Sequence, residues 1–367
     1  MSINEIIIYI MVVFAVLGAI DRIIGNKWGL GEQFEEGILA LGALALSMVG
    51  IIALSPVIAS ILEPVIVPVF NFFGADPAMF AGSILANDMG GAPLAKELAY
   101  TPEAAQFGGL IVGSMLGPTI VFTIPIALGI IKDSDRKYLA TGVLSGIITI
   151  PIGSFVGGLV AGFPIMMIVR NLIPIIIFAL LIALGLWKFE RFMIKGFTIF
   201  GKFIVIVITI GLISGIIEAL TGITVIPGMN PLSDGFTIVS DIAIVLAGAF
   251  PLVYAITKIF KNPLMKLGKL LGMNDVAAAG LIASLANNIP MLNMVKDMDN
   301  RGKIINFAFA TSAAFVFGDH LGFTAGFDSE MIFPMIIGKL TGGVSAVILA
   351  ALIARNLKEG ARKNAGR

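Results

Sequence analysis

The sequence predicts an all-α polytopic membrane protein with an inverted-topology internal repeat and discontinuous or re-entrant helices. Its 367 residues are 58% hydrophobic and 13% charged, about half the charged share of a soluble globular protein. Residues 85–98 read LANDMGGAPLAKEL, and residues 285–298 read LANNIPMLNMVKDM. Both stretches are apolar with polar groups near the middle, so the two halves of the chain carry a matched interruption.

Further matches between the two halves keep a spacing of 195 to 201 residues. Lys96 and Lys296 follow the two interruptions at the same distance. Glycine patterns can recur through membrane composition alone, but matched Asn and Lys positions do not follow from composition. Paired interruptions are typical of folds built from inverted repeats. The other matches are Pro56 with Pro251, Gly117-Pro118-Thr119 with Gly318-Asp319-His320, and Gly142 and Gly146 with Gly338 and Gly342.

Eleven segments of the chain are apolar enough to enter a membrane. A bilayer core of about 30 Å requires about 20 mainly apolar residues in each crossing helix. Three of the segments, at 77–99, 274–299 and 302–325, contain polar breaks. The remaining eight are expected at 3–24, 34–62, 104–131, 137–163, 165–187, 196–220, 236–260 and 329–355.

The positions of Lys and Arg predict the orientation, because cytoplasmic loops are enriched in both. Alternation of basic and non-basic loops requires one net crossing over 77–131 and one over 274–325. The segments 77–99 and 274–299 are therefore expected to enter and leave on one side. Nine net crossings result, with the N-terminus outside and the C-terminus inside. The basic loops are 22–27, 132–137, 188–202, 258–269 and 355–367.

The same pattern divides the chain into four parts. Five crossings separate equivalent points of the two copies, and an odd number of crossings inverts the second copy. The N-terminal apolar run lacks a basic start and a small-residue cleavage pattern, so it is interpreted as a first span and not as a signal peptide. The parts are a first repeat at 1–163, a linking helix and cytoplasmic loop at 164–195, an inverted second repeat at 196–355, and a cytoplasmic tail at 356–367.

Several classes of function are excluded by missing residues. The chain has no Cys and one His, which argues against disulfides, Cys-ligated metals and a His-rich metal site. It has no P-loop, no H-E-x-x-H motif and no G-x-S-x-G motif, so nothing predicts a bound nucleotide, a metal or another cofactor. The basic clusters lie at the expected membrane edges, which argues against binding of nucleic acid.

Asp88 is the leading candidate for a functional side chain, because ionisable groups inside a membrane are costly and usually serve a function. It follows Asn87 and precedes a Met-Gly-Gly break, where the backbone can leave helical geometry. A carboxylate here predicts a site for a cation. Two structural alternatives remain: Asp88 caps a half-helix, or it pairs with Lys96. The second copy carries Asn287 and Asn288 at this place, so the duplicated site holds one charge.

Asp319 and His320, within FGDHLGF, form the second candidate. An adjacent carboxylate can orient an imidazole and favour its charged form, which suits proton handling. Alternatively, Asp319 binds a cation while His320 donates a hydrogen bond, or the two form a structural pair at a helix break. Their counterpart in the first copy includes Thr119, an uncharged candidate for the same site.

Gln33 and Glu36, within QFEEG, are weaker candidates that are expected to line a vestibule. The alternative is that the acidic residues lie at a helix N-terminus, where carboxylates complement the helix dipole.

Long motifs throughout the chain resemble the EutH family, the ethanolamine transporters of bacterial ethanolamine-utilisation systems. The similarity covers essentially the whole chain. The motifs are INEIIIYIMVVF, AIDRI, QFEEG, LANDMGG, LAKEL, GSMLGPTIVFTIPIALGII, LANNIP, DMDNRGKIIN and FGDHLGF.

This resemblance implies a multi-pass protein of the bacterial cytoplasmic membrane that takes up ethanolamine. The substrate is mostly protonated at pH 7, with an ammonium and a hydroxyl group. A carboxylate such as Asp88 can hold the ammonium, with help from an aromatic face. The amides of Asn87, Asn287 and Asn288 can bond the hydroxyl, since an amide both donates and accepts.

Other activities remain as alternatives to simple uniport of the protonated amine. Proton-coupled symport needs a group that changes charge during the cycle, and His320 is the candidate. A membrane-embedded enzyme acting on an amino alcohol would need a nucleophile, a metal cluster or paired carboxylates, which the sequence lacks. A non-transporting sensor or scaffold would not need polar breaks in both repeats. Membrane lipid is an expected partner, and a homo-oligomer is compatible with the sequence.

Overall fold

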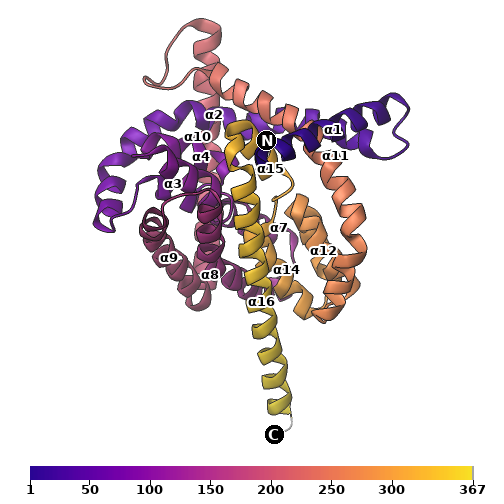
Figure 1. Ribbon diagram of the computed structural model, residues 1–367. Coiled ribbons are helices and arrows are strands. Elements are labelled where there is room, and N and C mark those ends of the chain that lie inside the picture. The colour runs from indigo at the N-terminus through magenta and orange to yellow at the C-terminus, as the bar shows by residue number, and fades with distance from the viewer. Residues whose placement is uncertain (366–367) are drawn as a thin grey trace.

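The computed structural model describes residues 1–365, and these form helices and connecting turns without a β-strand. The elements are α1 (Ile3–Ile23), α2 (Leu30–Phe72), α3 (Ala78–Ile84), η1 (Asn87–Met89), α4 (Gly91–Leu98), α5 (Pro102–Gln106), η2 (Phe107–Val112), α6 (Leu116–Pro118), η3 (Thr119–Thr123), α7 (Ile124–Ile130), η4 (Asp133–Asp135), α8 (Arg136–Val160), α9 (Ile165–Lys188), α10 (Glu190–Thr221), α11 (Leu232–Leu270), α12 (Asp275–Ala286), α13 (Asn288–Met294), η5 (Val295–Asp297), α14 (Asn300–Ala313), α15 (Asp319–Phe327), η6 (Ser329–Met331) and α16 (Ile332–Ala365). Figure 1 shows their arrangement.

Eight helical stretches within the described residues are long and apolar enough to cross a membrane. They coincide with the eight unbroken segments expected from the sequence, which confirms an all-α polytopic membrane protein. Their bounds are Ile3–Ile23, Leu30–Phe72, Pro102–Ile130, Asp133–Val160, Ile165–Lys188, Arg191–Thr221, Leu232–Ile259 and Ser329–Arg355.

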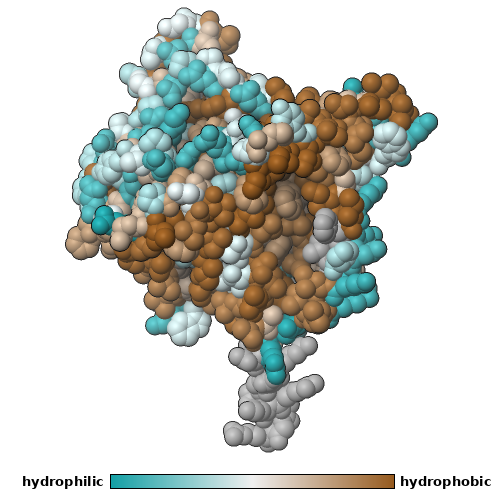
Figure 2. Space-filling model, in the orientation of Figure 1, coloured by the Kyte–Doolittle hydropathy of each residue, from teal (hydrophilic) through white to brown (hydrophobic). Residues whose placement is uncertain are grey.

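The surface has the polarity that such a protein requires. Figure 2 shows hydrophilic atoms at the upper left and along the right edge, with a broad apolar band between them. In Figure 1 the upper-left surface lies over α3 and the end of α2, and the right edge lies over α12 and the end of α11. The apolar band is therefore the surface that faces the hydrocarbon of the bilayer.

All three segments with polar breaks are interrupted helices. Residues 77–99 form α3 and α4 with the short η1 between them, residues 274–299 form α12 and α13, and residues 302–325 lie in α14 and α15. The span at 102–130 is also irregular, because two π-helical stretches, η2 and η3, separate its α-helical parts. Such backbone is tolerated at membrane depth only where it is buried in protein.

The interrupted segments of the two halves pack in the same way. A Cβ atom added to Gly117 would lie 1.9 Å from the carbonyl oxygen of Leu85, and one added to Gly318 would lie 2.0 Å from that of Ala286. The glycines of the two contacts are 201 residues apart, and so are their partners Leu85 and Ala286. Only glycine allows two backbones to approach this closely, which accounts for the glycine at both matched positions.

Matched long helices run antiparallel to each other. Thr149 of α8 donates to the carbonyl oxygen of Gly342 of α16 over 3.2 Å, and Gly157 of α8 packs against Pro334 of α16. Later residues of α8 therefore contact earlier residues of α16, so the two helices are antiparallel.

The same holds for α2 and α11. Gly37 packs against Leu246, while Asn230, just before α11, donates its backbone N–H to Ala53 over 2.9 Å. These two helices therefore also pack antiparallel.

The loop expected within 164–195 is almost absent, because only Phe189 separates α9 from α10. The expected linking helix at 165–187 matches α9, but the helix after it begins at Glu190 and not near residue 196. The basic residues on which the loop prediction rested are interspersed with apolar and helix-favouring residues. Such a stretch can remain helical.

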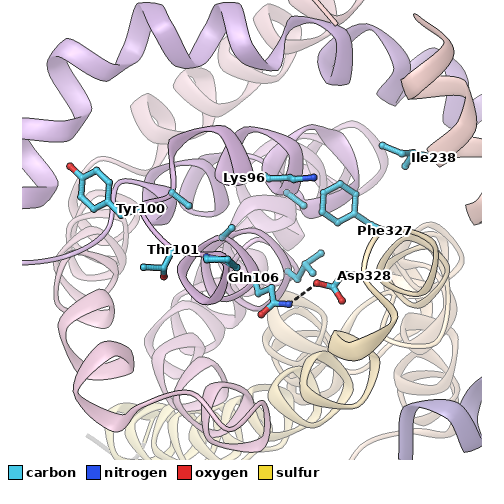
Figure 3. Close-up of a pocket in the computed structure, with 12 residues that line it drawn as sticks. Lys96, Tyr100, Thr101, Gln106, Ile238, Phe327 and Asp328 are labelled. Atoms are coloured by element: carbon cyan, nitrogen blue, oxygen red, sulfur yellow. Dashed lines mark hydrogen bonds between the residues drawn. The ribbon is translucent and has the colours of Figure 1, made fainter. Parts of the chain in front are cut away.

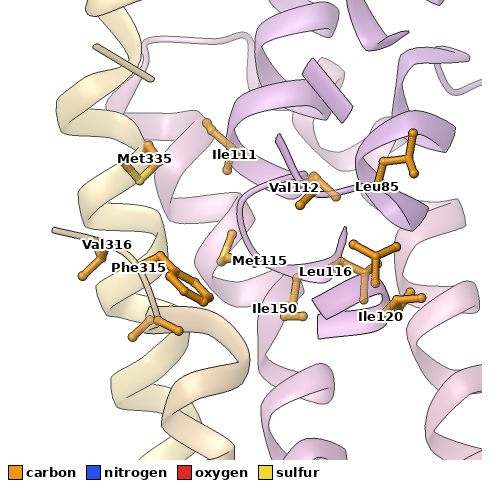
Figure 4. Close-up of a cluster of buried hydrophobic side chains, with 14 of the residues drawn as sticks. Leu85, Ile111, Val112, Met115, Leu116, Ile120, Ile150, Phe315, Val316 and Met335 are labelled. Carbon is orange, nitrogen blue, oxygen red and sulfur yellow. The ribbon is translucent and has the colours of Figure 1, made fainter. Parts of the chain in front are cut away.

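A buried apolar core surrounds the broken segments of both halves. Figure 4 shows Leu85, Met115 and Phe315 among its members. These residues come from the first interrupted segment, the irregular span that follows it and the turn before α15. The two halves thus share one core at the helix breaks, and this core holds the polar groups described next.

Candidate functional site

Asp88 lies in η1, the turn that joins the two half-helices of residues 77–99. The preceding residue is anchored, since the backbone N–H of Asn87 donates to the carbonyl oxygen of Gly113 over 2.8 Å. Gly90 ends the turn in the left-handed conformation, with a φ of 96°, which glycine adopts without a Cβ penalty. The turn therefore holds the carboxylate deep in the protein, with 16% of its side chain exposed.

His320 lies beside Asp88. Its Nε2 lies 3.9 Å from Asp88 Oδ1, and the imidazole is buried. The ring of Phe315 packs beside it, with 5.1 Å between the ring centroids. Lys96, the partner considered from the sequence, is exposed on α4 and has no ion pair with Asp88. The helix breaks of the two halves therefore meet at one polar cluster.

Lys339 of α16 completes this cluster, although it is not among the site residues predicted from the sequence. Its side chain is 1% exposed. The ammonium nitrogen lies 3.0 Å from His320 Nδ1 and donates to the carbonyl oxygen of Ser114. Lys339 is the one charged residue between Glu330 and Arg355 of an apolar segment. The rule that intramembrane charges serve a function would have found it.

Asp319 is the second carboxylate of the cluster. It begins α15, and its charge interacts with that of Asp88. Although it precedes His320 in sequence, the polar contacts of the imidazole are to Asp88, Lys339 and the Ser114 backbone. The expected Asp319–His320 pair is therefore replaced by contacts between residues from different elements.

Two buried asparagines carry polar atoms without a protein partner. Asn87 is fully buried, and neither its amide nitrogen nor its carbonyl oxygen has a hydrogen-bond partner. Asn288 donates to Thr123 Oγ1 over 3.0 Å, while its carbonyl oxygen is unpartnered. Unsatisfied buried amides are costly, so these atoms are suited to a polar ligand or to water.

Other predicted site residues serve the structure. Asn287 caps α13 by accepting the backbone N–H of Ile289 over 2.9 Å. The hydroxyl of Thr119 lies within hydrogen-bond distance of the carbonyl oxygens of Met115, at 2.8 Å, and Thr311, at 3.0 Å. Thr119 thus ties the first half of the chain to the second and leaves its hydroxyl occupied.

Gln33 and Glu36 lie far from this cluster along α2. That helix contacts the turn of Asp88 at Ile51, which a Cβ on Gly90 would meet at 2.3 Å. Glu36 precedes Ile51 by four helical turns, about 22 Å along the axis, and its side chain is exposed. The structure therefore separates the QFEEG residues from the polar cluster.

A cavity of about 560 Å³ opens beside α4 and α5. Figure 3 shows Gln106 and Asp328 on its wall, where Gln106 Nε2 donates to Asp328 Oδ2 over 2.7 Å. Ala92 of α4 and Leu110 of η2 also line it. Ala92 follows Asp88 by four residues, so one wall of the cavity belongs to the half-helix that begins after the turn of Asp88.

Comparisons with known proteins identify the family of this chain. The family model described as "Ethanolamine utilisation protein, EutH" matches residues 3–353. The chain belongs to the EutH family. No solved structure matches it.

Relatives of this EutH-family chain cover nearly its whole length. A protein of Listeria monocytogenes named "Probable ethanolamine permease EutH" is 68% identical over 97% of this chain and 96% of its own length. A protein of Escherichia coli K12 with the same name is 51% identical, with 96% of each chain covered. The Bacillus subtilis protein YxeR is also 51% identical, over 96% of this chain and 95% of its own.

Proposed function

We propose that this protein carries ethanolamine, as the protonated amine, across the bacterial cytoplasmic membrane. The observation that carries the proposal is the buried carboxylate of Asp88 at a helix break, beside Asp319 and Lys339. With a neutral imidazole at His320, the formal charges of these groups sum to −1. A single ammonium neutralises that charge, which suits one small cation. The names of the relatives as ethanolamine permeases support the choice of substrate.

The substrate's two polar ends have separate partners in this arrangement. Asp88 holds the ammonium, and the ring of Phe315 lies close enough to the cluster to contribute a cation–π contact. The unpartnered amide of Asn87 bonds the hydroxyl as donor or acceptor. Choline, with three methyl groups on its nitrogen, lacks the N–H donors that a carboxylate accepts. The proposed site therefore favours primary amines.

The two halves form an inverted-topology repeat, with nine net crossings and the N-terminus outside. The antiparallel packing of α8 against α16 and of α2 against α11 supports this proposal.

Cysteine labelling tests this orientation, since the native chain has no Cys. A single Cys at exposed Glu103 is expected to react with an impermeant maleimide from outside, and one at exposed Lys266 only after the membrane is opened. Asp76 would be a poor labelling site, because it is buried and accepts the backbone N–H groups of Ala78 and Tyr100. Labelling of both positions from one face would refute the inverted arrangement.

Transport proceeds as uniport down the electrochemical gradient of the protonated amine. An inside-negative potential attracts one positive charge with about 2.3 kcal/mol per 100 mV, enough for nearly fifty-fold accumulation without coupling. Uniport therefore needs only the cation site. The alternative, symport with a proton, would need an additional group that changes charge during the cycle.

Reconstituted liposomes separate these mechanisms and test the function itself. Labelled ethanolamine is expected to accumulate when a potassium diffusion potential is imposed, without added nucleotide. Uptake should then respond to the potential and not to a pH gradient at clamped potential, after correction for permeation of the neutral amine. Concentrative uptake driven by the pH gradient alone would establish proton coupling. Absence of uptake under every gradient would refute the transport proposal.

A further inference from the structure

The long helices separate into two bundles, and each bundle contains helices from both ends of the chain. The first bundle, called the frame, consists of α1, α2, α10 and α11. Gly37 of α2 packs against Leu246 of α11, and Gly50 of α2 packs against Ile208 of α10. The second, called the core bundle, consists of α8, α14 and α16 with the interrupted segments, the span at 102–130 and α15. Figure 1 shows α8, α14 and α16 at the centre and α11 toward the right.

The polar cluster belongs entirely to the core bundle, because η1, α15 and α16 supply its side chains. Contacts between distant segments hold this bundle together. Lys303 of α14 pairs with Asp135 of η4 at 2.7 Å, and the hydroxyl of Thr119 lies 3.0 Å from the carbonyl oxygen of Thr311. Polar contacts of this kind fix the core elements relative to one another.

The contact between the two bundles, called the seam, is different beside the polar cluster. There glycine meets aliphatic side chains: Gly90 of η1 packs against Ile51 of α2, and Gly322 of α15 packs against Leu246 of α11. Such contacts have no preferred direction. Lipid tails are as apolar as these side chains, so in a bilayer no hydrophobic force holds the seam closed.

Hydrogen bonds across the seam occur at helix ends. Asn4, near the start of α1, donates to the carbonyl oxygen of Glu330 over 2.6 Å and accepts the backbone N–H of Phe333 over 2.9 Å. The hydroxyl of Tyr100 donates to Asn71 Oδ1, near the end of α2, over 3.1 Å. The bonds to Glu330 and Asn71 are exposed, so water can replace either partner when the bond opens.

Cavities flank the close contact of the seam along α11. The cavity of about 560 Å³ lies between Ile238 of α11 and the core elements α4 and η2. A second cavity, of about 530 Å³, lies between Leu267 of α11 and the core elements α12, α14 and α16. Ile238 precedes Leu246 by about two helical turns, and Leu267 follows it by about six. The seam is therefore closely packed near Leu246 and hollow toward both ends of α11.

The chain passes between the bundles at turns that can act as hinges. The frame helices α2 and α11 lead into the core bundle through Gly74 and Gly272, whose φ values are 64° and 70°. A Cβ added to Gly74 would meet no described atom outside its own chain neighbours within 4 Å, and one added to Gly272 would meet the side chain of Arg301 at 3.7 Å. Loosely packed turns of this kind suit domain movements. The third connection is α9, which links α8 to α10.

We propose that the core bundle moves as one body against the frame and carries the polar cluster with it. The inference rests on the proposed function, because this movement exposes a substrate bound at Asp88 to one side of the membrane and then to the other. The two cavities provide the space for the displacement, and the glycine contacts of the seam allow the bundles to slide without breaking buried hydrogen bonds.

A disulfide across the seam tests whether transport needs the movement. A Cβ added to Gly322 would lie 2.7 Å from Leu246 Cγ, so Leu246→Cys with Gly322→Cys places two thiols opposite each other in a chain that has no other Cys. Oxidation is expected to abolish uptake of labelled ethanolamine into liposomes, and reduction should restore it. Uptake that continues after complete disulfide formation would overturn the proposal.

A pair inside the frame provides the matched control. Gly215 of α10 faces Leu232 of α11 in the same way, with 2.5 Å between an added Cβ and Leu232 Cγ. A disulfide in Gly215→Cys with Leu232→Cys is expected to leave uptake unchanged, because both residues belong to the frame.

Distances between spin labels measure the movement without an uptake assay and without replacing a glycine. Labels at the exposed residues Lys137 of α8 and Lys266 of α11 report the distance from core bundle to frame, and labels at Lys137 and exposed Lys296 of η5 report a distance within the core bundle. In lipid nanodiscs, double electron–electron resonance is expected to give two distances for the first pair and one for the second. Ethanolamine should change the proportions of the two.

The outcomes separate this inference from the proposed function. A single core-to-frame distance that ethanolamine does not change, in protein that takes up ethanolamine, would refute the movement. Two distances within the core bundle would refute its movement as one body. Two core-to-frame distances together with absent uptake would refute the proposed function and leave the movement intact.

Discussion

An Asp88→Asn variant is expected to bind ethanolamine at least about thirty times more weakly than the wild-type protein. Asn keeps the size of the side chain but removes the negative charge that faces the substrate's ammonium. Removing one partner of a buried charged contact costs about 2–5 kcal/mol, and each 1.4 kcal/mol is about a factor of ten in affinity. Equilibrium binding of labelled ethanolamine to purified protein in nanodiscs measures the loss.

Two variants control for effects on folding and on total charge. Asp241→Asn removes an exposed carboxylate from α11 and should leave affinity unchanged. Asp319→Asn removes the second carboxylate of the cluster and should weaken binding less than Asp88→Asn does, because Asp319 is not the residue facing His320 Nε2. Wild-type affinity in a folded Asp88→Asn protein would move the cation site to Asp319.

The second large effect is expected at a buried ion pair that joins the two halves of the chain. Lys303 of α14 contacts Asp135 of η4 at 2.7 Å, with side-chain exposures of 10% and 6%. Breaking such a pair by removing one partner costs about 3–5 kcal/mol, because the other charge stays buried. Asp135→Asn should therefore lower the free energy of unfolding by about that amount. Chemical unfolding in detergent micelles provides the measurement.

A nearby exposed pair gives a matched control for this prediction. Arg136 and Asp133 are also 2.7 Å apart, but the Asp133 side chain is 85% exposed, and exposed pairs contribute about 0–1 kcal/mol. Asp133→Asn should thus change stability little. The double variant Asp135→Leu with Lys303→Met leaves no unpaired charge and should recover most of the loss. An equal effect of Asp133→Asn and Asp135→Asn would contradict the assignment.

The helical architecture was predictable because hydropathy and repeat spacing are local properties of the sequence. A run of apolar residues must form a helix in a bilayer, whatever its neighbours are. This is why all eight unbroken spans appear near their expected positions. The stretch before residue 196, expected to include a loop, is helical from Glu190, because basic residues indicate the side of the membrane and do not end a helix.

The candidate site was predictable only in part. Asp88, Asp319 and His320 were identifiable because charged groups in an apolar segment stand out. Lys339 stands out equally, but its place in α16 is matched by Val143 in the first half, so the comparison of the two copies did not emphasise it. Glu36 met the same criterion of charge near an apolar run, yet it lies exposed on α2.

The sequence by itself determined that this is a helical membrane protein with polar breaks in several of its apolar segments. Only the tertiary structure decided which polar groups meet. Asp88 lies 232 residues before His320, and their contact depends on how two helix breaks pack. Local composition specifies a helix and its apolar length. It does not specify which side of each helix faces the shared core, and that orientation brings Lys339 to His320 and leaves Glu36 outside.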